Sequence, residues 1–199
     1  MIDPNGVTDL ARSPRQLEEF LLFCIVVAGK NADQQTRKLE DFLRGGEPFA
    51  FIRSLGANGG VEERLERAKL GKYRLLGESF RRLSHSGLDL RKCSLEELTR
   101  FPGIGMKTAK FFILHSRPGE MHAVLDTHVL AWMRERLAPA GARRPDVPRH
   151  SPQDPAAYSF WETVYFGLIL ARAREEGGPA GPINWAQVDL DLWKERRAL

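Results

Sequence analysis

Apolar residues recur at helical spacing along almost the whole of this 199-residue chain, and this periodicity is the feature that most constrains its fold. The stretch Ser13-Pro14-Arg15-Gln16 illustrates how the helices begin, because it joins a capping Ser, a Pro at the first helical position and a capping-box Gln. No segment shows the sustained alternation of apolar and polar residues that half-buried strands require. The sequence therefore predicts an all-α fold.

Caps and breaks divide the periodic pattern into separate helices. Ser94 opens a second capping box with Glu97, and Asp126 can cap the helix that follows it. The segment 106–116 is apolar on every side, which is typical of a helix buried in the core. The expected helices cover residues 14–29, 32–43, 48–55, 61–70, 72–83, 95–100, 106–116, 127–137, a long segment from a start signal at 151–154 to 176, and 185–197.

The order of the helices suggests two lobes within a single domain. We expect lobe A to hold residues 13–60 together with 138–199, and lobe B to hold residues 61–137 with a hairpin at 101–105. The segment 138–155 is rich in Pro, Ala and Arg and is expected to form a surface loop. Its basic residues either contact phosphate or are simply solvated; they are Arg143, Arg144, Arg149 and His150.

Cysteine usage and hydropathy exclude several classes of protein. Cys24 and Cys93 are the only cysteines, which rules out a disulfide framework and any four-cysteine zinc or iron–sulfur site. The longest apolar run, 20–28, is far shorter than the roughly 20 residues that span a bilayer. The first residues contain no basic region typical of a signal peptide. We therefore expect a cytoplasmic protein.

The charge balance permits nucleic-acid binding without demonstrating it. The chain has 30 basic and 26 acidic residues, which gives a net charge of +4, and its sequence pI is about 9.3. A basic pI is compatible with a polyanionic partner, but many basic proteins bind none. The charge balance alone therefore does not indicate a function, and the sequence motifs are needed for that.

The most informative motif is the segment Phe101-Pro102-Gly103-Ile104-Gly105, which separates two expected helices. Its two glycines allow backbone angles that are closed to other residues and let the chain approach a phosphate closely. The free N–H groups and the positive dipole end of the next helix face this hairpin, and such an end binds anions. The alternative is a plain corner between two helices that binds no ligand.

Two linked motifs give the chain a resemblance to a known family. The residues 101–109 resemble the hairpin Leu-Pro-Gly-Val-Gly-x-Lys-Thr-Ala of the helix–hairpin–helix (HhH-GPD) DNA glycosylase superfamily, which includes endonuclease III. The segment 124–129, Val-Leu-Asp-Thr-His-Val, then resembles the family's Val-Asp-Thr-His segment, in the same order and at a similar separation. Weaker similarity extends the resemblance to residues 20–137. It implies a two-lobed helical fold with a DNA-binding cleft between the lobes.

The resemblance also implies roles for individual residues. Lys107 matches the lysine whose neutral amine attacks the sugar C1′ in bifunctional glycosylases, and Asp126 matches the family's essential carboxylate. Alternatively, Lys107 is a solvated charge and Asp126 a simple helix cap. The hairpin would bind DNA phosphate, with a monovalent cation as a further ligand. Its candidate DNA-binding residues are Pro102, Gly103, Ile104, Gly105, Met106 and Thr108.

Further candidate DNA-binding residues, supported by weaker signals, lie outside the two motifs. Lys30 and Asn31 fall where endonuclease III-like enzymes carry a loop that fills the hole left by a flipped base, although a polar loop after a helix is an equal reading. Four aromatic residues are mostly core by periodicity, but one of them could stack on a flipped base; they are Phe160, Trp161, Tyr165 and Phe166.

The departures from the family limit what the resemblance implies. The chain lacks the four cysteines of the iron–sulfur cluster that endonuclease III-like enzymes commonly carry, so no such cofactor is expected. It also lacks the β-rich N-terminal domain of the oxoguanine and alkyladenine branches. The target base therefore cannot be inherited from any of these enzymes.

The sequence is compatible with three functions. The first is a DNA glycosylase that flips a damaged or modified base out of duplex DNA and cleaves its N-glycosidic bond, with or without Lys107-dependent lyase activity. The second keeps the fold but transfers an amino acid or amine to an activated 5-hydroxymethyl pyrimidine in phage DNA, because 27–31 and 189–193 resemble such transferases. The third is a helix–hairpin–helix module that only binds DNA.

Overall fold

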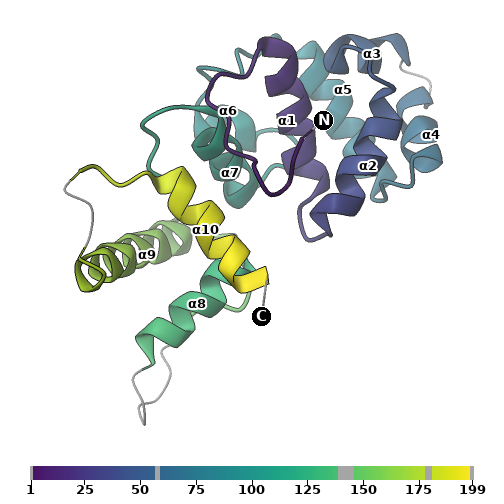
Figure 1. Ribbon diagram of the computed structural model, residues 1–199. Helices are drawn as coiled ribbons and strands as arrows, with labels where there is room; N and C mark the ends of the chain where they lie inside the picture. The colour runs from purple at the N-terminus through teal and green to yellow at the C-terminus, as the bar shows by residue number, and fades with distance from the viewer. Residues whose placement is uncertain (1, 57–58, 139–145, 178–180, 198–199) are drawn as a thin grey trace. The chain divides into compact units, whose positions relative to one another are not determined.

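The structure is a computed structural model that describes residues 2–56, 59–138, 146–177 and 181–197. Within these ranges all regular secondary structure is helical, which confirms the predicted all-α class (Figure 1). The helices are α1 (Pro14–Val26), α2 (Ala32–Leu43), α3 (Pro48–Ser54), α4 (Gly60–Arg67), α5 (Tyr73–His85), α6 (Leu95–Thr99), α7 (Met106–Ser116), α8 (Thr127–Leu137), α9 (Pro155–Glu175) and α10 (Trp185–Arg197).

Side-chain caps fix the start of several helices. Ser13 and Ser94 both form the expected capping boxes, in which the Ser side chain and the third helical residue exchange hydrogen bonds with the main chain. Asp126 caps α8, as predicted. The start of α9 differs from the expected signal at 151–154, because Asp154 is the capping residue and the helix begins at Pro155. The carboxylate of Asp154 accepts from the backbone N–H of Ala157, a bond that Ser151 lies too early to make.

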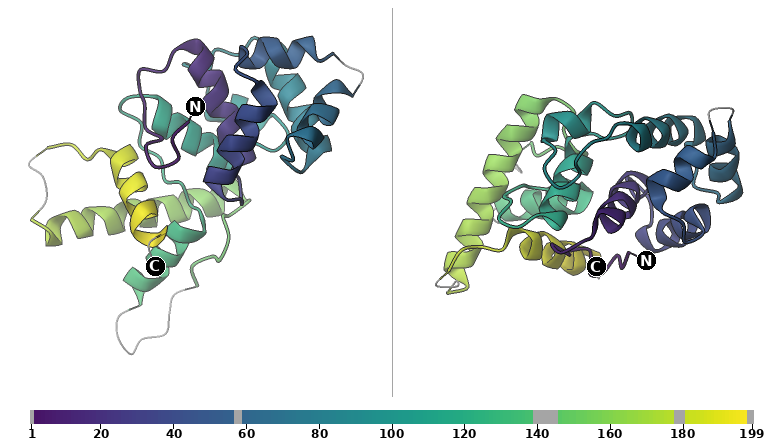
Figure 2. Two further views of the ribbon diagram at one scale, coloured as in Figure 1. Left: turned by 45° about the vertical axis from the view of Figure 1, so that its right-hand side comes forward. Right: turned by 90° about the horizontal axis from the view of Figure 1, so that it is seen from above.

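The chain forms two compact units, residues 1–117 and 118–199. These units do not coincide with the lobes expected from the sequence, in which the breaks fell at 60/61 and 137/138. In the first unit, unit 1, α1 is the central helix and packs against α2, α3, α5 and α7 (Figure 2). The buried residues of α1 include Phe20, whose ring is stacked with that of Phe23 at a centroid distance of 6.1 Å and tilted against that of Phe112 at 5.8 Å.

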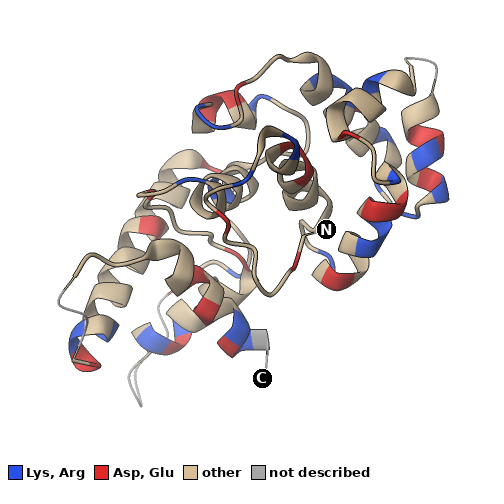
Figure 3. Ribbon diagram, turned by 45° about the horizontal axis from the view of Figure 1, so that its top comes forward, with Lys and Arg blue, Asp and Glu red and all other residues tan. Residues whose placement is uncertain are grey.

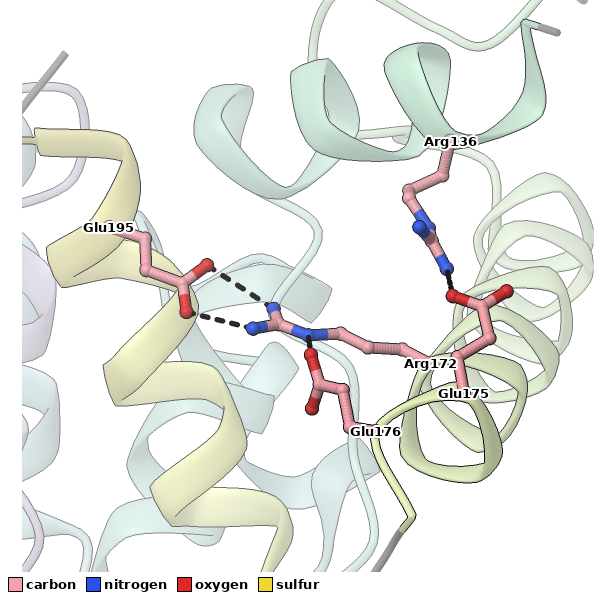
Figure 4. A network of polar contacts seen from close by, with 5 residues as sticks. All are labelled: Arg136, Arg172, Glu175, Glu176 and Glu195. Carbon is pink, nitrogen blue, oxygen red and sulfur yellow. Dashed lines mark hydrogen bonds and ion pairs between the residues drawn. The ribbon is translucent and has the colours of Figure 1, made fainter.

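The second unit, unit 2, is built from α8, α9 and α10, and α8 packs against both of the other helices. A network of charged side chains joins these helices (Figure 4). Arg172 of α9 donates two hydrogen bonds to Glu195 of α10 and one to Glu176, and Arg136 of α8 pairs with Glu175. Because these side chains are partly or well exposed, each ion pair of the network contributes little to stability.

Burial agrees with the expected core in α7 and differs from it in α9. Most of α7 is buried, as its apolar sequence predicted. In α9, by contrast, Tyr165 is buried but the side chain of Phe160 is 60% exposed, so the core assignment of Phe160 is wrong. The two rings of Phe160 and Trp161 instead form an edge-to-face pair near the start of α9.

Two further expectations concern the surface of the chain. No helix in the described ranges is both long enough and apolar enough to cross a membrane. Of the basic loop expected at 138–155, Arg143 and Arg144 lie outside the described residues, whereas Arg149 and His150 are exposed.

Candidate active site

The hairpin between α6 and α7 is a tight turn closed by one main-chain hydrogen bond, from the N–H of Ile104 to the carbonyl oxygen of Phe101 at 3.1 Å. Gly103 has a φ of +81°, a conformation that L side chains adopt only with strain. The side chain of Ile104 is 4% exposed and anchors the turn, while Gly103 and Gly105 are exposed. The hairpin therefore presents its backbone outward and its apolar side chain inward.

Gly105 is not required by the fold itself. Its φ of −90° is open to any residue, and a Cβ added at this position would meet no atom within 4 Å. It is the N-cap of α7, yet it has no side chain that could bond the first helical amides. The N–H groups of Met106 and Lys107 therefore have no partner within the helix. A glycine that the fold does not need is explained if an outside group approaches the backbone there.

Lys107 lies in the first turn of α7 and is half-buried. Among the described residues, no carboxylate or carbonyl oxygen accepts a hydrogen bond from its amine, and no carboxylate forms an ion pair with it. Its charge acts on the buried thiol of Cys24 in α1, as does the charge of Arg12. Burial nevertheless dominates and raises the pKa of Cys24, so this cysteine is a neutral core side chain beside the lysine.

Asp126 lies at the start of α8 and performs the capping role that the sequence predicted. Its Oδ1 accepts a hydrogen bond of 2.8 Å from the backbone N–H of Val129. Within the described ranges, no donor reaches its second oxygen, Oδ2. The side chain is only half-buried, so a carboxylate oriented by its own helix still offers one oxygen to a ligand.

Helix α9 holds the chain that leads to Asp126. The buried hydroxyl of Tyr158 donates to the carbonyl oxygen of Ala123 at 2.8 Å and accepts from the N–H of Leu125 at 3.1 Å. One turn further along α9, Glu162 accepts from the N–H of Ala123 at 2.9 Å. Three side-chain bonds to two consecutive turns of α9 therefore fix the segment just before the capping carboxylate.

A second carboxylate approaches the same tyrosines. Asp189 of α10 is 6% exposed, and its charge acts on both Tyr158 and Tyr165, as the charge of Asp126 does. Burial, the largest cause, raises the pKa of both tyrosines well above the ordinary range, and the two carboxylates raise it further. Both phenols therefore stay neutral, and the hydroxyl of Tyr158 acts as a hydrogen-bonding group in unit 2.

The two softer candidates, Lys30 and Asn31, have structural roles in unit 1. The side chain of Asn31 caps α2 by accepting from the N–H of Gln34 at 3.0 Å. The amine of Lys30 donates to the carbonyl oxygen of Leu70, in the loop between α4 and α5. Burial is the main cause that lowers the pKa of Lys30, and the charges of Lys72 and Lys38 lower it further.

The predicted site residues thus fall into two groups. The hairpin residues, Met106, Lys107 and Thr108 are contiguous in unit 1, and Thr108 is buried. Asp126 belongs to unit 2. Sequence reasoning did not single out Tyr158 or Glu162, because each bonds residues more than 30 positions away and no local pattern marks such a contact. Two signals were available: the spacing of Tyr158 and Glu162, one helical turn apart, and the resemblance of 189–193 to the transferases, a segment that includes Asp189.

Comparison with known proteins gave no match: no family model, no curated protein and no solved structure matches this chain. Among the described residues, no three His, Cys, Asp or Glu side chains are grouped so that they could hold a metal ion. The monovalent cation at the hairpin, which the family resemblance implies, stays a prediction.

Proposed function

We propose that this protein is a DNA base-modifying enzyme of the HhH-GPD type, which flips a damaged or modified base out of duplex DNA and cleaves its N-glycosidic bond. The observation that carries the proposal is the hairpin with Gly105, whose glycine neither backbone angle nor packing requires. An approaching phosphate accounts for it, because the uncapped amides of α7 can bind an anion and a glycine leaves them open to a close approach. Phosphate contacts would position the protein on the duplex without reading its sequence.

The proposed chemistry uses the carboxylate of Asp126. As the glycosidic bond breaks, positive charge develops on the sugar, and an oriented carboxylate stabilises that charge. The capping bond to Val129 fixes Oδ1, which leaves Oδ2 for the sugar or for the attacking nucleophile. Flipping the nucleotide costs a few kcal/mol and is easiest for a weakly paired base.

Lys107 extends the proposal to lyase chemistry. In the part of the chain that the structure describes, no carboxylate forms an ion pair with its amine. Once the base has left, this amine would attack C1′ and form an iminium with loss of water. Loss of the proton at C2′ would then expel the 3′-phosphate. In this route the amine of Lys107 attacks in its neutral form.

A second candidate function is the transfer of an amine to an activated 5-hydroxymethyl pyrimidine in DNA. Two carboxylates, Asp126 and Asp189, act on the same pair of buried tyrosines, and such a cluster suits an ammonium-bearing co-substrate. The amine nitrogen would bond to the methylene carbon, pyrophosphate would leave with its oxygen, and Asp126 would accept the proton. In that reaction the glycosidic bond survives.

One experiment separates these functions from each other and from simple DNA binding. Duplexes carrying uracil, thymine glycol, 8-oxoguanine, a mismatch or 5-hydroxymethyluracil would be incubated with wild-type protein and with Asp126→Asn, and free base would be measured. We expect base release by the wild type on at least one duplex and its loss in the variant. If no base is released, pyrophosphorylated hydroxymethyl-DNA with free amino acids tests the transferase. If neither reaction occurs, both enzymatic proposals are wrong and a DNA-binding module remains.

A further inference from the structure

Three lysines gather in unit 1 beside the loop between α4 and α5, and we refer to Lys30, Lys38 and Lys72 as the lysine patch. The Nζ of Lys30 donates to the carbonyl oxygen of Leu70 and lies 3.3 Å from the position that a Cβ on Gly71 would take. Lys72 follows Gly71 directly and is the N-cap of α5. Lys38 lies on α2, and its charge acts on Lys30. Lys30 and Lys38 are eight positions apart and Lys72 comes 42 positions after Lys30, and the charges of Lys38 and Lys72 both act on the amine of Lys30.

The lysine patch differs from the neighbouring helices α4 and α5, several of whose arginines form ion pairs. On α4 the two signs of charge are interspersed (Figure 3), and basic residues of α4 and α5 pair with carboxylates. These pairs are Arg64–Asp41, Arg67–Glu63, Arg81–Glu62 and Arg82–Glu78. In the part of the chain that the structure describes, no carboxylate forms an ion pair with any lysine of the patch. Burial is the main cause that lowers the pKa of Lys30, and the charges of Lys72 and Lys38 lower it further. A bound anion would offset the repulsion among the three lysines.

The lysine patch adjoins the hairpin through the first turn of α5. The Cγ of Leu75, in that turn, lies 3.6 Å from the position of a Cβ on Gly103. Lys72 precedes Leu75 by three residues, a rise of about 5 Å along a helix. Successive nucleotides of one DNA strand rise by about 3.4 Å. A strand whose phosphate lies at the hairpin therefore reaches the patch within about two nucleotides.

We propose that the lysine patch is a second phosphate-binding site, which takes one or two phosphodiester groups of the DNA strand that the hairpin holds. The inference rests on the proposed function in that the ligand is DNA and the hairpin holds one of its phosphates. Lys30 is fixed to the loop by its bond to Leu70, whereas Lys72 is exposed and Lys38 is half-buried. The contact is purely electrostatic, so it is independent of base sequence and strongly dependent on salt.

The test is the salt dependence of binding to a short, fluorescently labelled duplex that contains a tetrahydrofuran abasic analogue. Each lost phosphate contact lowers the slope of log affinity against log salt by about 0.9. We expect the double variant Lys38→Gln/Lys72→Gln to lower the slope by about 1.8, so that its affinity falls about twelvefold less than the wild type between about 50 and 200 mM salt. The variant Lys38→Arg/Lys72→Arg should keep the wild-type slope.

A charge-matched control distinguishes a site from general attraction. The double variant Lys92→Gln/Lys194→Gln removes the same charge from exposed lysines outside the patch and should keep the wild-type slope. An equal fall of the slope in both glutamine variants, or no fall in either, would overturn the site. Because Lys72 has a φ of 50°, Lys72→Gly replaces Lys72→Gln if circular dichroism shows that the double variant is unfolded.

The outcome is independent of base excision. A reduced slope in a protein that releases no base would support the lysine patch and contradict the glycosylase. Base release with an unchanged slope would support the glycosylase and overturn the patch. Failure of the wild type to bind the duplex at any salt concentration would overturn both.

Discussion

The hydroxyl of Tyr158 accepts a hydrogen bond of 3.1 Å from the backbone N–H of Leu125, the residue directly before Asp126. The same hydroxyl donates to Ala123, so one buried side chain of α9 satisfies two main-chain groups of this segment. The position of the candidate catalytic carboxylate therefore depends on two helices. Helix α8 supplies the N–H group that bonds the carboxylate of Asp126, and α9 fixes the segment 123–125 that leads to Asp126.

Replacing Tyr158 by Phe should lower both stability and turnover. The change leaves the N–H of Leu125 without its buried partner, which costs about 1–3 kcal/mol in the free energy of unfolding. Freed from this bond, Asp126 should shift, and we expect kcat to fall about tenfold or more with little change in KM. Tyr165→Phe is the matched control, because Tyr165 is also a buried tyrosine of α9. Urea unfolding and base-release kinetics give the two readouts. A destabilised Tyr158→Phe protein with wild-type kcat would show that the hydroxyl does not position Asp126.

Two substitutions of Asp126 separate its capping role from its catalytic role. Asn is as good an N-cap as Asp, so Asp126→Asn should cost only a few tenths of a kcal/mol, through the lost charge at the helix end. Asp126→Ala removes the cap as well and should cost about 1 kcal/mol. Base release should fall about 100-fold or more in both variants, because both lack the carboxylate. Thermal unfolding and single-turnover assays measure these effects. Full activity in Asp126→Asn would reduce Asp126 to a structural residue.

The two glycines of the hairpin should respond differently to alanine. Gly103→Ala forces a Cβ onto a residue with φ of +81° and should cost about 1–2 kcal/mol of stability. Gly105→Ala meets no atom and has an ordinary φ, so the free energy of unfolding should change by less than about 1 kcal/mol. DNA affinity should nevertheless fall in Gly105→Ala, because the new methyl group covers the amides of α7. Unchanged affinity in this stable variant would remove the main support for phosphate binding at the hairpin.

The ion pair between α4 and α5 makes a prediction about pH. Glu62 and Arg81 are joined at 2.5 Å, and the hydrogen bond from Arg81 is the main cause that lowers the pKa of Glu62 below its ordinary value of 4.5. A carboxyl group with a lowered folded pKa contributes stability above its unfolded pKa and loses it as the pH falls through the folded pKa. Since both side chains are partly exposed, Arg81→Gln should cost no more than about 1 kcal/mol at neutral pH.

This cost should disappear in acid, where Glu62 is protonated in the wild type and in the variant alike. Urea unfolding of both proteins at neutral pH and well below the folded pKa of Glu62 measures the difference. Arg82→Gln is a control with a more exposed partner, Glu78, and should show a smaller effect. A destabilisation by Arg81→Gln that persists unchanged in acid would mean that packing, rather than the ion pair, accounts for it.

Local sequence signals predicted most of the helices, because caps and apolar spacing act within a few residues. The helices 32–43, 106–116 and 185–197 have the expected bounds, and the capping roles of Ser13, Ser94 and Asp126 are confirmed. The start of α9 was misplaced because Ser-Pro and Asp-Pro signals follow each other at 151–155, and sequence spacing alone did not choose between them.

Contacts between distant segments could not be predicted from the sequence. Nothing near Tyr158 indicates that its hydroxyl bonds to the chain 33 positions earlier, and nothing near Lys30 indicates that its amine reaches the loop after α4. The exposure of Phe160 was missed for a related reason. Its spacing fits an apolar face of α9. Burial, however, depends on whether other helices cover that face, and at Phe160 the face is left exposed.

The most direct test of the proposed enzyme is borohydride trapping of the covalent intermediate. Duplex oligonucleotides with the lesions named above, together with one carrying an abasic site, would be incubated with wild-type protein, Lys107→Ala and Lys92→Ala in the presence of borohydride, and free base would be measured in parallel. A trapped protein–DNA adduct that forms with the wild type and with Lys92→Ala, but not with Lys107→Ala, is the predicted result. No adduct and no released base on any duplex would contradict the glycosylase.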